Sequence, residues 1–389
     1  MKKQDYFGYL RNQCMSIPEL CEDQIKGVYK GLENTIPKDV IKDIRKVIVT
    51  GCGDSYLAAM ASIPVFRKYC SRFGMDFSFE RNIDSARYMK IKEENAPYTL
   101  IIGISASGSS SRVQEVLLRG NHHGCKTLAL TNNADSVSGK AAQYVLVVNT
   151  PPFEIASPGL RSYYASLVGL FMFAAYMGEV KGLSPEGSLD KLADAIREYT
   201  ASYAPILEKM DDEMFEVAKE WYTHKGYFTI GDDVDFASAY FVAAKIVECS
   251  GHMCSTADSE SWCHVQTFAH DQEKIGTIFV AEKEKNNRSR IGETIYQAYH
   301  MGFPVLLTSN GSKEDFGVPA DMDIKEFTLP STPEGFEFLY PLLNYMPGSI
   351  LSSYIAALNE TPYFRTEPGS PHQKEGATNM TRSSNIVIV

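Results

Sequence analysis

The sequence predicts an α/β fold made of two similar units in tandem, each built on a parallel sheet with helices on both faces. Short apolar runs alternate with longer stretches in which apolar residues recur at helical spacing, which is typical of strands joined by crossover helices. The order of strand, glycine turn and alanine-rich helix occurs in both halves of the chain. A break rich in glycine, proline and serine, KGLSPEGS at 181–188, separates the halves and predicts the domain linker.

The composition limits the possible partners and the compartment. With 389 residues, of which 44% are apolar and 22% charged, the chain is long enough for two domains with ample cores. The net charge of −10 argues against nucleic acid or an anionic membrane as the main partner. The first residues, MKKQDYFGYL, lack the apolar core of a signal peptide. Because the eight cysteines also form no CxxC pair, we expect a cytoplasmic protein.

The first half predicts a helical lead-in and one α/β unit. Residues 1–45 are polar and helical in pattern, with breaks at Pro18 and Pro37. The most apolar segment, 165–177, predicts a buried helix that is too short to span a bilayer. Apolar runs predict buried parallel strands at 47–50, 77–79, 99–104, 126–131 and 144–148.

The second half repeats the pattern. Apolar runs predict strands at 227–230, 277–280, 304–308 and 327–329, and helical spacing predicts helices at 189–221, 236–249 and 290–300. We therefore expect four segments: a helical segment at 1–45, a first domain at 46–188, a second domain at 189–358 and a tail at 359–389.

The stretch at 99–120, TLIIGISASGSSSRVQEVLLRG, carries the strongest functional signal. A buried strand at 99–104 is followed by small and hydroxyl-bearing residues at 105–110 and then by helical spacing. A helix N-terminus favours an anion, because its first N–H groups are unpaired and its dipole is positive there. The hydroxyls of Ser105, Ser107 and Ser110 supply further donors, so we interpret this loop as a phosphate cradle. An ordinary strand-to-helix connection with a serine N-cap is the alternative.

Several motifs in series resemble a known family. GCGDSY at 51–56, SASGSS at 105–110, TNNADS at 131–136 and the segment 154–164 resemble the first sugar-isomerase (SIS) domain of phosphosugar isomerases. Residues 228–264 resemble the second SIS domain of the isomerase portion of glucosamine-6-phosphate synthase, and also fructosamine-6-phosphate deglycases. The resemblance covers about 45–355. It implies two tandem SIS domains, each a flavodoxin-like parallel sheet sandwiched by helices, with phosphate binding in the first and catalysis in the second.

The resemblance also implies site residues in the first domain and around it. Phosphate contacts are expected from Ser55, Ser105, Ser107 and Ser110, with Gly53 and Gly108 in the same loops. Possible further substrate contacts are Asp54, Ser157, Glu260 and Lys374.

In the second domain, the resemblance implies a catalytic glutamate that follows a lysine on the alanine-rich helix. KIVE at 245–248 keeps this pattern, with Lys245 and Glu248. His264, sixteen residues further on, matches a histidine that the family contributes across a homodimer interface. A buried carboxylate suits proton transfer between C1 and C2, and a histidine can pass a proton to a ring oxygen or a leaving amine. The alternatives are a Lys245–Glu248 ion pair on a solvated face and a hydrogen-bonded structural histidine.

Three departures from the synthases argue against glucosamine-6-phosphate synthesis and favour a different sugar phosphate. Asp54 stands where the synthases have threonine, and Ala106 where they have glutamine. Their ring-opening lysine has no counterpart around Ser383 and Ser384.

The tail at 359–389 is expected to close over the sugar, although an exposed flexible tail is equally compatible with its composition. Its candidate substrate contacts are Arg365, His372, Lys374 and Arg382, and Lys374 is a possible substitute for the missing lysine.

A cysteine- and histidine-rich stretch offers a rival interpretation. Thiolates and imidazoles bind zinc, but the spacing here matches no closed site, so we expect small buried cysteines and no metal. The stretch contains Cys249, His252, Cys254, Cys263 and His264.

The sequence thus predicts a phosphosugar enzyme that needs no organic cofactor and acts as a homodimer with a shared site. The reaction is either aldose–ketose isomerisation or fructosamine-6-phosphate deglycation. The alternative from another class is a non-catalytic SIS sensor that binds a phosphosugar and reports it to a partner. Such regulators usually append a DNA-binding helix-turn-helix, for which the acidic segment 19–36 is a poor match.

Overall fold

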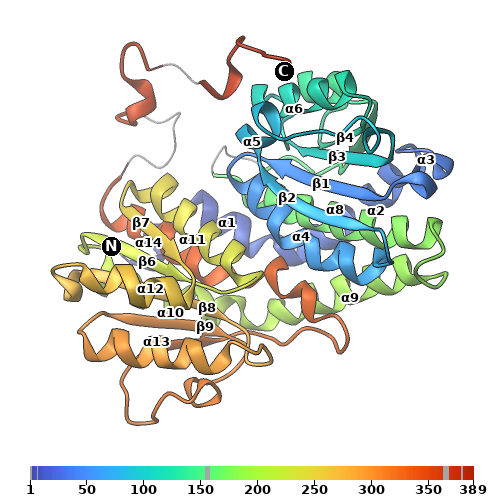
Figure 1. Ribbon diagram of the computed structural model, residues 1–389. Helices are drawn as coiled ribbons and strands as arrows, with labels where there is room; N and C mark the ends of the chain where they lie inside the picture. The colour runs from blue at the N-terminus through green and yellow to red at the C-terminus, as the bar shows by residue number, and fades with distance from the viewer. Residues whose placement is uncertain (1, 7, 154–157, 362–367, 378–379) are drawn as a thin grey trace. The chain divides into compact units, whose positions relative to one another are not determined.

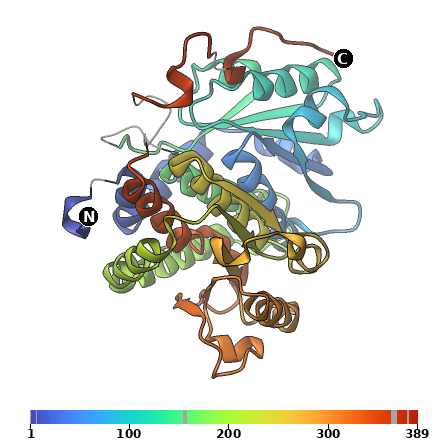
Figure 2. The same cartoon turned by 90° about the vertical axis from the view of Figure 1, so that its left-hand side faces the viewer.

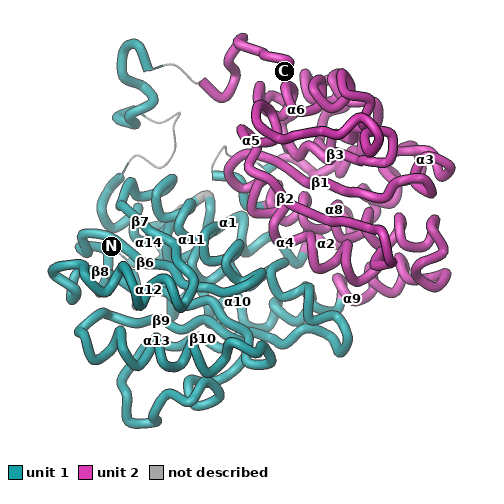
Figure 3. Tube along the Cα trace, viewed as in Figure 1, with its two compact units in different colours: residues 1–18, 153–160, 198–377 teal, residues 19–152, 161–197, 378–389 magenta. Residues whose placement is uncertain are grey.

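The computed structural model describes residues 2–6, 8–153, 158–361, 368–377 and 380–389, which form two compact units (Figure 3). Unit 1 comprises residues 1–18, 153–160 and 198–377, and unit 2 comprises 19–152, 161–197 and 378–389. The lead-in and the tail are therefore both divided between the units. The helix α9 (Ser188–Tyr203) crosses the boundary near residue 197. The four segments expected from the sequence stay a prediction.

Unit 2 is built on a five-stranded parallel sheet with the order β2-β1-β3-β4-β5 (Figure 1). This is the flavodoxin-like order, in which the direction of strand addition reverses between the first and third strands. The α/β prediction is therefore confirmed. The strands are β1 (Lys46–Gly51), β2 (Asp76–Arg81), β3 (Thr99–Ile104), β4 (Lys126–Thr131) and β5 (Tyr144–Val147).

Helices cover both faces of this sheet, which is why its central strands are continuous apolar runs. All six residues of β3 are buried. Helices α4 and α8 pack on one face, and α5, α6 and α7 on the other. The helices of unit 2 are α2 (Ile17–Glu33), α3 (Lys38–Asp43), α4 (Asp54–Cys70), α5 (Asn82–Arg87), α6 (Ser111–His122), α7 (Val137–Ala141) and α8 (Arg161–Val180).

Helix α8 is the core helix expected at 165–177, but it is longer than expected. Among the described residues it alone is long and apolar enough to cross a membrane by length and composition, so the expectation that it is too short is wrong. Its apolar window is 83% buried inside the fold, as a core helix requires. The expected burial is confirmed, and the cytoplasmic location stays a prediction.

Unit 1 repeats the topology with a second parallel sheet, in the order β10-β9-β8-β6-β7. Counted from its own first strand, this order is again flavodoxin-like, so the tandem arrangement is confirmed. Helices α11 and α14 lie on one face and α12 and α13 on the other (Figures 1 and 2). The strands are β6 (Gly226–Ile230), β7 (Met253–Ala257), β8 (Ile275–Ala281), β9 (Val305–Ser309) and β10 (Lys325–Thr328). The helices are α1 (Tyr9–Met15), α10 (Leu207–Trp221), α11 (Asp235–Ser250), α12 (Ser259–Val265), α13 (Arg288–His300) and α14 (Met346–Leu358).

Strand β7 was not expected from the sequence. It reads MCSTA and has no apolar run, because it lies at the edge of its sheet and only Ala257 is fully buried. An edge strand pairs with a neighbour on one side only and is partly exposed to solvent, so polar and small residues are compatible with it.

A buried carboxylate ties the N-terminal residues of unit 1 to helix α10. The side chain of Asp211 is completely buried and accepts hydrogen bonds from Arg11 at 2.7 and 2.9 Å and from the Tyr354 hydroxyl at 2.7 Å. The Lys3 ammonium lies 2.8 Å from the same carboxylate. Burial alone would raise the pKa of Asp211, but these partners outweigh it and hold the pKa below its usual value.

We expect Asp211→Asn to lower the free energy of unfolding by about 3 kcal/mol at pH 7, because it leaves Arg11 and Lys3 beside a neutral group. A carboxyl with a lowered folded-state pKa contributes its stability above the unfolded-state pKa of about 4 and loses it as the pH falls further. Urea unfolding of both proteins between pH 7 and pH 3 measures this. A difference that stayed constant over that range would contradict the ionic role of Asp211.

Candidate functional site

The phosphate loop of the sequence analysis lies where the strand order of unit 2 reverses. Strands β1 and β3 are neighbours, and their carboxyl ends are Gly51 and Ile104. Their connections leave for opposite faces of the sheet, since β1 leads into α4 and β3 into α6. Ligands of open α/β sheets bind in the crevice that such a reversal creates. The loops at 52–53 and 105–110 border this point.

Hydroxyl groups of the serine loop (residues 105–110) lie within hydrogen-bond reach of one another and of the neighbouring loop. The Oγ atoms of Ser107 and Ser109 are 2.7 Å apart, and Ser110 Oγ is 3.7 Å from Cys52 Sγ. Ser107 is exposed and Ser110 half-buried, whereas Ser105 is only 6% exposed and its N–H donates to the carbonyl of Leu130. Ser107 and Ser110 are therefore the more accessible of the predicted phosphate contacts.

Two helices begin at these loops. Gly53 caps α4 with a φ of +57°, and Ser55 lies half-buried in the first turn. Ser110 occupies the cap position of α6 but makes no hydrogen bond to the first turn of that helix. Its hydroxyl therefore remains available to a ligand. With two positive helix ends and several hydroxyl donors, the loops suit a dianion such as phosphate.

Gly108 fixes the shape of the serine loop. Its φ is +67°, and an added Cβ would lie 1.9 Å from Ser136 Oγ. Its carbonyl accepts a hydrogen bond from the N–H of Ser138 at 3.0 Å. Ser136 in turn caps α7 by accepting a hydrogen bond from the N–H of Gly139. The loop is thus locked to the start of α7.

Ala106 and Asp54, the two residues of the first domain that differ from those of the synthases, have different surroundings. The carbonyl of Ala106 accepts hydrogen bonds from Asn132 N–H at 3.0 Å and Thr131 Oγ1 at 3.3 Å, so its backbone is held although its side chain offers no donor. Asp54 lies in the first turn of α4, and its charge adds to burial in raising the pKa of Tyr163 on α8. The remaining predicted contact in this region, Ser157, lies outside the described residues.

Glu248 is accessible and paired with a buried lysine. It lies in the last turn of α11, and its side chain is 35% exposed. Lys245 is completely buried, and its ammonium lies 2.8 Å from Glu248 Oε2 and 4.6 Å from the centre of the Phe241 ring. Glu248 is therefore not the buried carboxylate that the sequence analysis associates with proton transfer. The Lys245–Glu248 ion pair, which the sequence analysis gave as the alternative to a catalytic role, is formed. Its lysine, however, is buried in the core and does not lie on a solvated face.

His264 lies on α12 with its side chain 71% exposed. Its Nε2 is 2.8 Å from Glu260 Oε1, and the other oxygen of Glu260 pairs with Arg290 Nε at 2.7 Å. The hydrogen bond with His264 and the charge of Arg290 lower the pKa of Glu260. Within the described ranges, no hydrogen bond or ion pair joins His264 to Glu248. The two side chains of the same chain are therefore not held in contact with each other.

The cysteines and histidines near α11 have separate partners. The Cys249 side chain is buried, burial raises the pKa of the Cys254 thiol to about 12, and Cys263 lies 3.5 Å from Thr294 Oγ1. The imidazole of His252 contacts Ser250 Oγ at 2.9 Å. No group of three or more potential ligands in the described part of the chain could hold a metal ion.

The tail is divided between the units. Lys374 is exposed in unit 1, just after the short helix that contains His372, whereas Arg382 belongs to unit 2. Arg365 lies outside the described residues. Whether the tail closes over a sugar therefore stays a prediction.

The last residues lie along helix α6, a contact that the sequence analysis missed. Arg119 Nε donates to the Val389 carbonyl at 2.6 Å, and the N–H of Val387 donates to the buried Glu115 at 3.2 Å. Arg87 also binds Glu115, at 2.7 Å. The polar residues on one face of α6, a helix whose other face packs on the sheet, were the sequence feature that could have indicated this contact.

The equivalent reversal point of unit 1 carries carboxylates. After β6, Asp232 accepts hydrogen bonds from Ser259 N–H and Oγ and from Asn287 Nδ2, each at 2.7 Å. Asp235 is completely buried, and burial raises the pKa of Glu282, after β8, to about 7. This point therefore disfavours an anion.

We expect Gly108→Ala to destabilise the protein by about 1 kcal/mol more than Gly74→Ala, because only the former displaces the Ser136 cap. Gly74 also has a positive φ, +85°, but an added Cβ there meets nothing within 4 Å. Urea unfolding of the two variants compares them. Equal losses would show that the serine loop is not held through α7.

Comparison with known proteins finds a family match for one part of the chain. Residues 40–177 match the SIS domain family. Over 329 residues the chain is 25% identical to a glutamine–fructose-6-phosphate aminotransferase (isomerizing) of Clostridium perfringens, a match that covers 83% of this chain and 50% of that protein. The chain spans about half the length of the curated relatives it matches.

Solved structures extend the likeness to both units. The C-terminal domain of a glucosamine–fructose-6-phosphate aminotransferase from Francisella tularensis aligns with a TM-score of 0.80 at 17% identity, covering 94% of this chain and 99% of that one. A glucosamine-6-phosphate deaminase from Thermotoga maritima aligns with a TM-score of 0.62 at 16% identity, covering 90% and 95%. Residues 40–177 therefore match a SIS domain in sequence, and the chain as a whole has the fold of two SIS-like domains in tandem.

Proposed function

We propose that this chain binds a phosphorylated sugar at the serine loop of unit 2 and processes it as an aldose–ketose isomerase or a fructosamine-6-phosphate deglycase. The observation that carries the proposal is the meeting of two helix N-termini and accessible serine hydroxyls at the strand reversal between β1 and β3. Such a site holds a phosphate without a basic surface. The proposal is therefore compatible with the acidic net charge of the chain.

Glu248 is the proposed base. In the isomerase reaction it takes the proton from the carbon beside the carbonyl, an enediol forms, and the same carboxyl returns the proton to the other carbon. Its exposed carboxylate can meet a substrate, and the buried Lys245, 2.8 Å away, fixes its orientation. Lys245 is thus proposed to position the base.

Deglycation would use the same proton transfer. A ketosamine loses a proton at C1 and gains one at C2, which gives a glycosylamine, and water then displaces the amine. His264 is proposed to donate a proton to the departing amine, because an imidazole titrates near neutral pH. The absence of a glutamine donor at position 106 and the acidic Asp54 support a substrate other than that of the aminotransferases.

We expect Glu248→Gln to lower turnover by about 10²–10⁴-fold, the usual contribution of a general base. Proton NMR in D₂O, with a panel of hexose 6-phosphates and fructosamine 6-phosphates, follows exchange at C1 and C2 and amine release. Tight binding without any turnover by the unmodified protein would favour the sensor alternative. Turnover that survives Glu248→Gln would reject the role of Glu248.

Two further variants complete this experiment. Glu216→Gln on α10 is a matched control, since Glu216 is also exposed and pairs with a lysine three residues on, at 2.5 Å, and it should leave turnover unchanged. Ser107→Ala/Ser110→Ala should weaken substrate binding roughly tenfold or more by removing donors to a charged group. If that double variant binds normally, the serine loop is not the phosphate site.

A homodimer is also proposed, with the edge strand β7 and the end of α12 at its interface. Three exposed apolar side chains lie on these elements or directly after them: Met253 is 78% exposed, Val265 63% and Phe268 79%. His264 immediately precedes Val265. Apolar patches of this kind mark interaction sites more often than free surface.

We expect Phe268→Asp to convert the dimer to a monomer, because it places a charge in an apolar contact. Sedimentation velocity measures the oligomeric state, and turnover should fall with it. Tyr88→Asp, at a 73% exposed position in unit 2, is the control that should remain dimeric. Full activity in a monomeric Phe268→Asp protein would exclude a shared site.

A further inference from the structure

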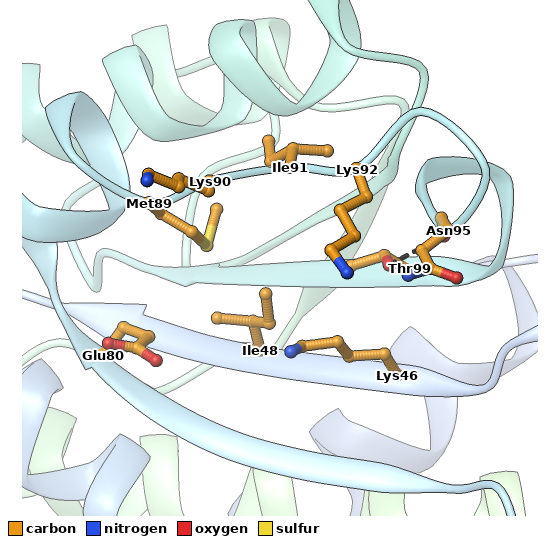
Figure 4. Close-up of a pocket in the computed structure, with 9 residues that line it drawn as sticks. All are labelled: Lys46, Ile48, Glu80, Met89, Lys90, Ile91, Lys92, Asn95 and Thr99. Atoms are coloured by element: carbon orange, nitrogen blue, oxygen red, sulfur yellow. Dashed lines mark hydrogen bonds between the residues drawn. The ribbon is translucent and has the colours of Figure 1, made fainter.

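Two cavities lie beside the sheet of unit 2. The first extends along one face of the sheet, and the second lies at the amino ends of β1 and β2, away from the serine loop. The first, of about 310 Å³, has the ammonium groups of Lys46 and Lys92 at one end and the carboxylate of Glu80 at the other (Figure 4). Lys46 also pairs with Asp76 at 3.0 Å. Because charges of both signs line this cavity, it shows no clear preference for an anion or a cation.

The charged residues that line the other cavity are all cations. Its volume is about 470 Å³, and it is bordered by Lys42, Arg45, Arg72 and Lys181. No aspartate or glutamate is among the described residues that line it. In a chain with a net charge of −10, four positive side chains around one cavity form a marked local excess of positive charge.

The fold brings these side chains together at one end of the sheet. Residues 42–45 lead into β1 and residues 72–75 into β2, while Lys181 directly follows α8. The Lys181 ammonium donates to the carbonyl oxygens of Ile41, Lys42 and Ile44 at 2.7–3.1 Å. Lys181 therefore anchors the segment that carries Lys42 and Arg45.

The other three cations have no carboxylate partner among the residues that the structure describes. Within the described ranges, Lys42, Arg45 and Arg72 form no ion pair, and the Arg45 guanidinium lies 4.3 Å over the ring of Tyr98. Burial lowers the pKa of Lys181. The nearby charge of Asp43 opposes this shift, whereas the charges of Arg45 and Arg72 add to it. Among the described residues, no carboxylate is thus in direct contact with the cations that line this cavity.

An aromatic side chain completes the lining. Phe73 lies in the turn between α4 and β2 and is fully exposed, at 105% of its reference area. An unpacked phenylalanine beside unpaired arginines offers a flat apolar face next to oxyanion-binding groups. Guanidinium forks recognise phosphoryl oxygens in a bidentate way, and the lysine adds a point charge.

We propose that this cavity binds a small organic phosphate that carries at least two negative charges and a flat ring. The site is distinct from the serine loop and independent of the proposed function, since the two lie at opposite ends of the same strands. Six-residue strands separate the two ends by about 20 Å. The phosphoryl groups would contact Arg45, Arg72 and Lys42, and the ring would stack on Phe73.

Isothermal titration calorimetry of the full chain tests this, with ADP and inorganic pyrophosphate as probes in low-salt buffer. We expect saturable binding of both, with ADP the tighter. Lys42→Ala/Arg72→Ala should weaken both by tenfold or more, since each charge-assisted hydrogen bond contributes that much. Phe73→Ala should weaken ADP alone. All three positions are exposed, so the fold should persist, as circular dichroism would verify.

Two controls make the outcome decisive. Lys30→Ala/Lys191→Ala removes two charges from exposed positions of unit 2 outside the cavity and should not alter binding. Ser107→Ala/Ser110→Ala should also leave ADP binding intact. No saturable binding, or binding that responds to the serine variants and not to Lys42→Ala/Arg72→Ala, would overturn the proposal. Equal affinities of ADP and pyrophosphate would overturn the ring contact.

Discussion

The reversal of strand order at the third strand is the constraint on which the rest of this structure depends. In unit 2 it sends α4 and α6 to opposite faces of the sheet while their first turns stay side by side beyond β1 and β3. Parallel strands oblige both helices to begin at the same edge, so two positive dipole ends meet there. Given these two helix N-termini, the serine loop needs only small residues with hydroxyl groups to form an anion site.

The duplicated topology shows that this geometry alone does not make an anion site. Unit 1 has the same reversal, with Asp232 and Glu282 after its strands β6 and β8, whereas in unit 2 Asp54 follows β1 and the serine loop follows β3. The Asp232 carboxylate accepts hydrogen bonds from Ser259 and Asn287, so these donors are already engaged within the protein. The two units thus share one topology but differ in the residues of the loops at the strand reversal.

The sequence predicted the sheets well because their strands are buried on both faces. β3 and β4 were located to the residue, since a short apolar run between polar turns indicates a buried strand. β7 escaped because an edge strand needs no apolar run. The exposure of Glu248 was also not predicted. The spacing along a helix shows that Lys245 and Glu248 can pair, but it does not show which of them faces the core. The roles of the site residues themselves stay predictions.

The complete burial of Lys245 also has a consequence for chemical modification. An amine-reactive reagent acylates lysines that it can reach in water, and the ammonium of Lys245 has no accessible surface while α11 is packed. Its acylation would require that helix to open. The rate of modification at this one lysine therefore reports how often the end of α11 detaches from the core, which neither a melting temperature nor a rate of turnover reveals.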